Sequence, residues 1–415
     1  MREPIKQENL RGISLASFRT GVRNVLNFRA SFMAGSRFSS VSLVPEVVSQ
    51  MLELGTTKHS KEEIVNILES NAISLDMSAD ETRLNIKASL PSEKAELFVT
   101  LLSEILRTPK FAENELTFLS KRLEAGLLEV KQDTRTQAWK HLLRSIYPGE
   151  HPFYQETEEK DIMSLKSLKR ENLMEFHAKH YGLGNVNIAL AGDVDHEMWS
   201  GLINKFFGDW QLLSNMPVSA KTKSDLKTRK NIFISGKASA DLFMGQILDL
   251  DVLSRDYFAI RPATYVLGGD FVSRLMQEVR EKRGLTYGTN ASHFGIKDGD
   301  TGLFYLWGTF APHLLERGIA EMRKVFEIWT KKGITNKELS RAKQAMSGNW
   351  KVSLADSRGV ADVLIAVLEI GRDLSFIDEY PKIIESLTLK EVNQAIKKYI
   401  DPKKFVTVAA GSIEK

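Results

Sequence analysis

The feature that most constrains the fold of this chain is an internal duplication. The segment SLKRENLMEFHAKHY, followed by VNIALAG near the middle of the chain, resembles SLTLKEVNQAIKKY, followed by VTVAAG at its end. Gly192 and Gly411 are 219 residues apart, and Leu168 and Leu387 have the same separation. A repeat of this length indicates two copies of one domain rather than a solenoid unit. We therefore expect a first domain at 1–210, a linker at 211–230 and a second domain at 231–415.

The alternation of apolar and polar residues predicts the kind of domain that is duplicated. Ile73, Leu75 and Met77 alternate with polar residues, and after a turn at 78–80 the same pattern continues to Leu90. This pattern is typical of a half-buried hairpin. Ser60 and Glu63 form a capping box at the start of a helix, and many later segments carry one apolar stripe. The fold class is therefore α+β. We expect two homologous α/β domains, each a mainly antiparallel sheet covered on one face by helices, that face each other across a chamber.

Composition excludes several classes of partner and site. A net charge of +4 is too small and too dispersed to indicate a nucleic-acid or membrane surface. The absence of cysteine excludes disulfides, thiolate metal sites and cysteine nucleophiles. No signal peptide or run of 18 apolar residues is present, so the compartment stays open between cytoplasm and, if a signal peptide preceded this sequence, a bacterial periplasm.

The lysines of 212–230 would fit a basic arm that binds nucleic acid. The segment is short, lacks an apolar period and includes Asp225. A solvated connector is the better interpretation.

The segment FVSRLMQEVREKRGLTY at 271–287 carries the strongest candidate site. Phe271, with later apolar residues at helical spacing, predicts an amphipathic helix that ends at Gly284 before a strand. Arg280 and Tyr287 would then point into one space. On spacing alone the structural interpretation is favoured, in which Arg280 complements a helix terminus and Tyr287 packs in a sheet.

The duplication, the order of elements and LGGDFVSRLMQEVREKRGLTYG together resemble the pitrilysin or insulinase-like zinc peptidases. The resemblance is to the short two-domain type related to mitochondrial processing peptidase. In that family an arginine and a tyrosine with this spacing approach a zinc site built by an opposing first half. The resemblance implies that the Tyr287 hydroxyl donates toward the scissile carbonyl or its oxyanion and that Arg280 orients substrate and tyrosine. Gly268 and Gly269 are expected to let the chain turn tightly before a helix rather than to cradle a phosphate. In the family they resemble a loop near the substrate chamber.

The chain departs from this family at the zinc motif. Active members carry HxxEH, in which two histidines bind zinc and the glutamate activates water. The corresponding residues here are Glu46, Val47, Val48, Ser49 and Gln50. The family's third ligand, a glutamate, falls near Gly126, with Glu124 and Glu129 close by. Catalytic zinc needs three protein ligands, so we expect no metal in this chain.

His177 and His180 offer an alternative pair of metal ligands, three residues apart on an expected helix. Because no carboxylate has a favourable spacing, we interpret them as two histidines on a solvated face.

These features predict a zinc-free subunit of a heterodimeric metallopeptidase, which completes the partner's site with Arg280 and Tyr287 for peptide hydrolysis. The chain would need no cofactor of its own, and zinc is expected in a homologous partner subunit; the isolated chain could instead form a homodimer. Peptide is the expected substrate. The alternative is a non-catalytic structural or peptide-holding subunit of a larger complex. Retention of the arginine and the tyrosine favours the first hypothesis, because a scaffold has no chemical use for them.

Overall fold

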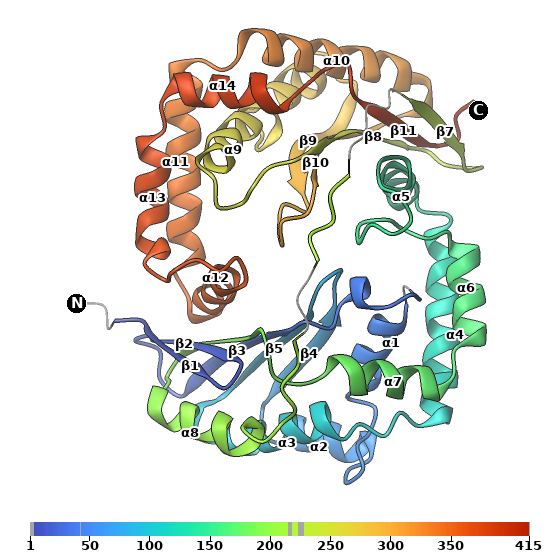
Figure 1. Cartoon of the computed structure of the whole chain (residues 1–415). Coiled ribbons are helices and arrows are strands. Elements are labelled where there is room, and N and C mark those ends of the chain that lie inside the picture. Colours follow the sequence, from blue (N-terminus) through green and yellow to red (C-terminus); the bar gives the residue numbers. More distant parts are fainter. Residues whose placement is uncertain (1–3, 42, 215–217, 223–227, 415) are drawn as a thin grey trace. The chain divides into compact units, whose positions relative to one another are not determined.

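The computed structural model of the chain describes residues 4–41, 43–214, 218–222 and 228–414. The chain forms two compact units from interleaved segments (Figure 1). The first unit comprises the described residues of Met1–Ala125, Glu159–Pro217 and Lys351–Ile377. The second comprises those of Gly126–Glu158, Val218–Trp350 and Asp378–Lys415.

The first unit contains a six-stranded sheet with the order β1-β2-β6-β3-β5-β4. Its strands are β1 (Lys6–Leu10), β2 (Ile13–Arg19), β3 (Val25–Phe32), β4 (Ser74–Ala79), β5 (Leu84–Pro91) and β6 (Val186–Gly192). Only the β2–β6 pairing is parallel among these strands. Apart from α5 (Thr134–Ile146), the helices that begin in the first half of the chain are α1 (Val44–Met51), α2 (Lys61–Ser70), α3 (Ala95–Arg107), α4 (Glu113–Val130), α6 (Glu158–Ser167), α7 (Arg170–His180) and α8 (His196–Phe207).

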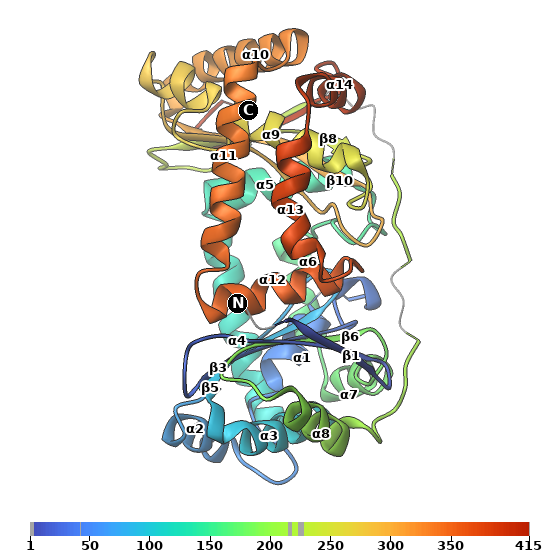
Figure 2. The same cartoon turned by 90° about the vertical axis from the view of Figure 1, so that its left-hand side faces the viewer.

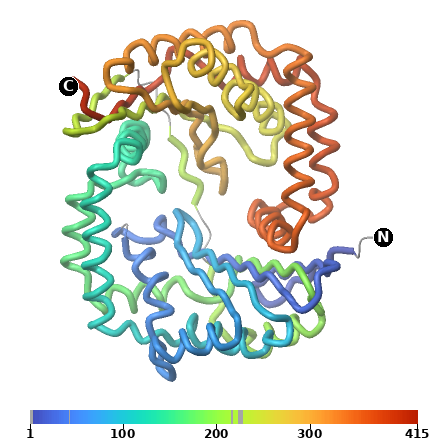
Figure 3. Tube along the Cα trace, turned by 180° about the vertical axis from the view of Figure 1, so that it is seen from behind, coloured from blue at the N-terminus to red at the C-terminus, as the bar shows by residue number. Residues whose placement is uncertain are grey.

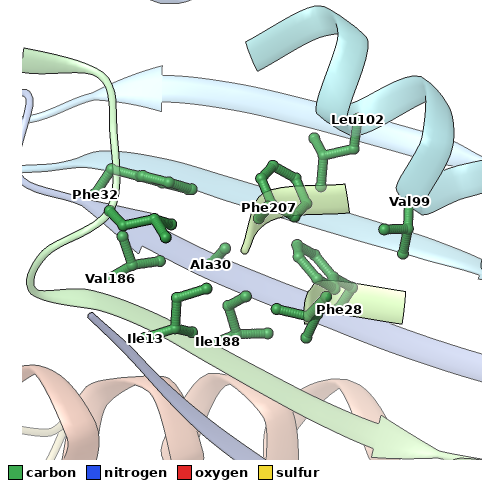
Figure 4. A pocket seen from close by; sticks show the side chains of 11 residues that line it. Ile13, Phe28, Ala30, Phe32, Val99, Leu102, Val186, Ile188 and Phe207 are labelled. Atoms are coloured by element: carbon green, nitrogen blue, oxygen red, sulfur yellow. The ribbon is translucent and has the colours of Figure 1, made fainter. Parts of the chain in front are cut away.

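Helices cover both faces of this sheet. Phe28 and Ala30 face α3 and α8 around an apolar cavity of about 10 Å³ (Figure 4). On the opposite face the Asn27 amide donates to Ser357 Oγ at 2.9 Å, and Arg29 Nε donates to Asp362 at 2.6 Å. Both acceptors belong to α12 (Ser357–Glu369), which lies across this face (Figure 2).

The expectation that helices cover only one face of the sheet is therefore wrong for this unit. Asn27 and Arg29 alternate with apolar residues, a pattern that predicts side chains facing solvent. Both side chains are nevertheless buried. Their polar groups are buried because α12 supplies hydrogen-bond partners, and α12 lies some 330 residues further along the chain.

The second unit contains a five-stranded sheet with the order β7-β11-β8-β10-β9. Its strands are β7 (Arg229–Phe233), β8 (Ala240–Leu248), β9 (Thr286–Phe294), β10 (Gly302–Phe310) and β11 (Val406–Gly411). Only β7 and β11 pair in parallel among these strands. The remaining helices are α5 (Thr134–Ile146), α9 (Arg255–Gly268), α10 (Leu315–Lys332), α11 (Asn336–Ser353), α13 (Phe376–Ser386) and α14 (Leu389–Tyr399). Two mainly antiparallel sheets packed with helices confirm the α+β class.

One face of the second sheet is covered by α5, a helix from the first half of the chain. Leu142 and Ile146 pack with Phe243 of β8 and Val408 of β11 in one buried cluster. Helices are thus exchanged between the two halves of the sequence. In Figure 3 the green helix α5 packs on the second sheet, and the orange-red helix α12 packs on the first. Each unit is thus built largely from one half of the sequence and completed by a helix from the other.

The expected domain boundaries stay a prediction. Within the expected linker, residues 215–217 and 223–227 lie outside the described residues. The Ala220 amide donates to Asp300 at 2.8 Å, so this part of 211–230 belongs to the second unit. Within the described residues, no helix is long and apolar enough to cross a membrane.

Candidate functional site

The degenerate zinc motif lies on α1, where its three altered positions bind one another and a neighbouring helix. Ser49 is 1% exposed, and its hydroxyl donates to the Glu46 carbonyl at 2.8 Å. The Gln50 amide nitrogen lies 3.3 Å from the Glu46 carboxylate. The Gln50 carbonyl oxygen accepts a 2.8 Å hydrogen bond from the guanidinium of Arg122 on α4. A positively charged side chain, the guanidinium of Arg122, therefore lies beside this motif.

These residues do not fit a zinc ion. A hydroxyl, an amide and one carboxylate are a poor donor set beside a positively charged guanidinium. Gly126 has no side chain to offer, and the Glu124 carboxylate is 2.9 Å from the Lys166 ammonium. Across the described residues no group of three histidine, cysteine, aspartate or glutamate side chains could hold a metal.

His177 and His180 also do not form a metal site, but the interpretation of a solvated face is wrong. His177 Nε2 lies 2.8 Å from the Leu106 carbonyl, and its ring stacks on Tyr181. Burial lowers the pKa of His177, which favours the neutral ring that donates to this carbonyl. His180 is buried between Phe38 and Phe176. The sequence pattern did not predict the burial of these histidines. They lie on the side of α7 that packs, together with Phe176, and this packing is not visible in the sequence.

Arg280 lies in a π-helix rather than in the expected α-helix. The π-helix η3 spans Met276–Glu281, and it follows a turn that contains Phe271. Its ladder includes a 3.0 Å bond from the Lys282 amide to the Gln277 carbonyl, five residues back. A π-helix is less regular than an α-helix and occurs often at functional sites. Phe271 is 73% exposed, so its assignment to the buried stripe of this helix is also wrong.

Tyr287 is the second residue of β9, an edge strand of the second sheet. Gly284 takes a φ of +60° and turns the chain from η3 into this strand, as the sequence predicts. Tyr287 is 91% exposed, and its hydroxyl makes no hydrogen bond within the described part of the chain. The side chain of Arg280 is 37% exposed, with Glu281 Oε1 at 3.6 Å from its Nε. Neither residue is a packed part of the core.

Gly268 and Gly269 end α9, beside β9. A Cβ on Gly268 would lie 2.2 Å from the Ala291 amide nitrogen, and one on Gly269 would lie 2.5 Å from the Tyr265 ring. Close packing of α9 therefore explains both glycines, and their contact with substrate stays a prediction.

Two family profiles match most of this chain. The family profile described as insulinase, peptidase family M16, matches residues 32–154. The profile described as peptidase M16 inactive domain matches residues 167–346. The chain belongs to the M16 family of peptidases.

Its M16 relatives include a protein with a non-peptidase name. The non-peptidase homolog YmxG of Helicobacter pylori is 23% identical over 356 residues, which cover 86% of this chain and 81% of that protein. An uncharacterized zinc protease, also named YmxG, from Bacillus subtilis is 23% identical over 77% of each chain.

Solved structures show the same fold over almost the whole length. A peptidase M16 inactive domain from Pseudomonas fluorescens superposes with a TM-score of 0.86 at 26% identity, covering 98% of each chain. A Helicobacter pylori protease superposes with a TM-score of 0.87 at 17% identity, covering 98% of this chain and 99% of that one.

Proposed function

We propose that this chain is the zinc-free subunit of a heterodimeric metallopeptidase and that it completes the partner's active site with Arg280 and Tyr287. The observation that carries the proposal is the contrast between the degenerate zinc motif on α1 and the region of Arg280 and Tyr287. The degenerate zinc-motif residues Glu46 and Gln50 interact with each other and with Arg122, whereas Tyr287 exposes to solvent a hydroxyl that has no partner among the described residues.

The chemistry of peptide hydrolysis gives Tyr287 a role. Attack on the scissile carbonyl places a negative charge on its oxygen, and a positioned O–H donor stabilises that oxyanion. Tyr287 would donate this hydrogen bond, and Arg280 would orient substrate and tyrosine. The zinc of the partner would supply the activated water. Loss of one such donor costs roughly 3 kcal/mol, or about a hundredfold in rate.

The test is steady-state peptide cleavage by a homologous HxxEH-bearing subunit, measured alone and after addition of this chain. We expect the partner alone to be nearly inactive and the mixture to cleave. Tyr287→Phe should lower turnover by about one to three orders of magnitude without affecting association, and Arg280→Ala should act similarly with weaker substrate binding. Tyr305→Phe, on β10 of the same sheet, is the control that should leave turnover unchanged. Wild-type turnover from a fully assembled Tyr287→Phe pair would reject the proposal.

The isolated chain serves as a second arm of this test. Metal analysis should find no stoichiometric zinc, and the chain should cleave no peptide. One tightly held zinc per chain that Glu46→Ala removes would contradict the proposal.

The second candidate function is a non-catalytic structural or peptide-holding subunit. The non-peptidase name of the Helicobacter pylori relative favours it. On this hypothesis Arg280→Ala and Tyr287→Phe leave the activity of any partner unchanged.

A further inference from the structure

Phe271 is an exposed aromatic residue on a turn that the structure holds rigidly. The Asp270 carboxylate accepts a 3.1 Å hydrogen bond from the Val272 amide and a 2.6 Å bond from the Arg341 guanidinium. The Ser273 hydroxyl donates to the Asp270 carbonyl at 2.5 Å. The backbone on both sides of Phe271 is therefore fixed, although the ring itself is 73% exposed.

The turn is also tied to the π-helix that carries Arg280. The Gln277 side-chain amide donates to the Phe271 carbonyl at 3.0 Å. Gln277 and Arg280 both belong to this π-helix. The turn that carries Phe271 is thereby bonded to the helix that carries Arg280.

The guanidinium of Arg280 rests over the Phe271 ring. Its Cζ is 5.8 Å from the ring centroid, within the range of a cation–π contact. The Glu281 carboxylate is 3.6 Å from Nε, beyond hydrogen-bond distance. The ring therefore limits where an otherwise solvent-exposed guanidinium can go.

We propose that Phe271 is the positioning residue of Arg280. Its π face holds the guanidinium in the orientation that the reaction uses, and it does not contact the reacting atoms. This inference rests on the proposed function, in which Arg280 orients substrate and Tyr287. It explains why a large aromatic ring is kept exposed on a rigid turn, since burial of that ring would remove it from the arginine.

Two substitutions of Phe271 distinguish the effect of its aromatic ring on Arg280 from the effect of its apolar volume. Phe271→Leu keeps an apolar side chain but removes the aromatic ring, whereas Phe271→Tyr keeps the ring. In the reconstituted pair we expect Phe271→Leu to lower kcat about three- to tenfold, with a smaller change in KM, and Phe271→Tyr to retain wild-type turnover. Val272→Ala is the matched control because Val272 is the adjacent residue, 55% exposed, with no aromatic ring. Its turnover should equal that of the wild type.

A second measurement, by NMR, detects the contact between Arg280 and Phe271 in the isolated chain. The side-chain resonances of Arg280, assigned by their loss in Arg280→Lys, should show a ring-current shift in the wild type and in Phe271→Tyr. That shift should disappear in Phe271→Leu. An Arg280 resonance that Phe271→Leu leaves unmoved would reject the contact in solution.

The outcomes distinguish the inference from the proposed function. Wild-type turnover of Phe271→Leu together with impaired Arg280→Ala overturns the positioning role and leaves the proposed function intact. Wild-type turnover of Arg280→Ala and Tyr287→Phe overturns the proposed function and the positioning role with it.

Discussion

At the scale of single residues, Glu53 is placed where a charge is unfavourable. It lies in the turn after α1, and burial raises the pKa of its carboxyl group from 4.5 to about 7, with the negative charge of Asp76 acting in the same direction. Between these two pH values the native state therefore binds a proton that the unfolded chain has released. The contribution of Glu53 to stability is fully present below about pH 4.5 and is lost as the pH rises through 7.

Glu53→Gln should remove this pH dependence. Relative to the wild type, the variant should gain about 1–2 kcal/mol of unfolding free energy between pH 5 and pH 8, less than the full shift implies because solvent screens a partly exposed carboxyl group. Urea unfolding at both pH values measures the difference. Glu62→Gln, on the exposed side of α2, is the control. An equal stability difference at the two pH values would show that the Glu53 carboxyl group is not perturbed.

At the scale of secondary-structure elements, the contact between α9 and β9 supports the strand that presents Tyr287. Gly268→Ala would place a methyl group 2.2 Å from the Ala291 amide, a backbone atom that cannot move independently. Overpacking of this kind costs about 1–3 kcal/mol. Thermal unfolding should show the loss. Gly348→Ala in α11 is the matched control, because nothing lies within 4 Å of its added methyl and the substitution should stabilise the helix by about 0.5–1 kcal/mol. Unchanged stability of Gly268→Ala would mean that α9 shifts freely on β9.

The elements that the sequence predicts well are those with local signals. The capping box of Ser60 and Glu63 opens α2 as expected, and the β4–β5 hairpin follows the predicted alternation. β1 was not predicted, because Lys6–Leu10 is a polar edge strand with little buried surface. The π-helix was also not predicted, since its hydrogen-bond ladder differs from that of an α-helix without a distinct residue pattern.

For the candidate site, the sequence identifies the altered zinc positions and the arginine–tyrosine pair through the family resemblance. It does not identify Arg122 or Phe271. Arg122 is one of many cationic residues on helix surfaces, and only the packing of α4 beside α1 brings it to Gln50. Phe271 fits a helical apolar stripe, and only the fixed turn shows that its ring is exposed beside Arg280. The chamber expected between the halves stays a prediction.

At the scale of the whole molecule, each sheet is completed by a helix from the other half of the sequence, so the folding of each half depends on the other. The N-terminal end of α5 is fixed to the second sheet, because the Thr134 hydroxyl donates to Asp241 at 2.6 Å and Trp307 Nε1 donates to the same carboxylate at 2.9 Å. The N-terminal end of α12 is fixed to the first sheet in a similar way, since Ser357 accepts from Asn27. Neither sheet is fully covered by helices from its own half.

Separately produced segments 1–210 and 231–415 should therefore fold poorly alone and assemble when they are produced together. Segment 231–415 alone would expose the face of Phe243 and Val408 that α5 covers, at a cost of about 1.5–3 kcal/mol for each large apolar side chain left in water. Size-exclusion chromatography and circular dichroism should show aggregation or loss of cooperative unfolding for each segment, and a 1:1 complex with cooperative unfolding for the pair. Leu142→Ser in the first segment should prevent assembly because Leu142 is fully buried, whereas Phe118→Ser, at a 63% exposed position of α4, should not. A segment 231–415 that unfolds cooperatively by itself, with the stability of the pair, would show that α5 is dispensable and that the two halves are independent domains.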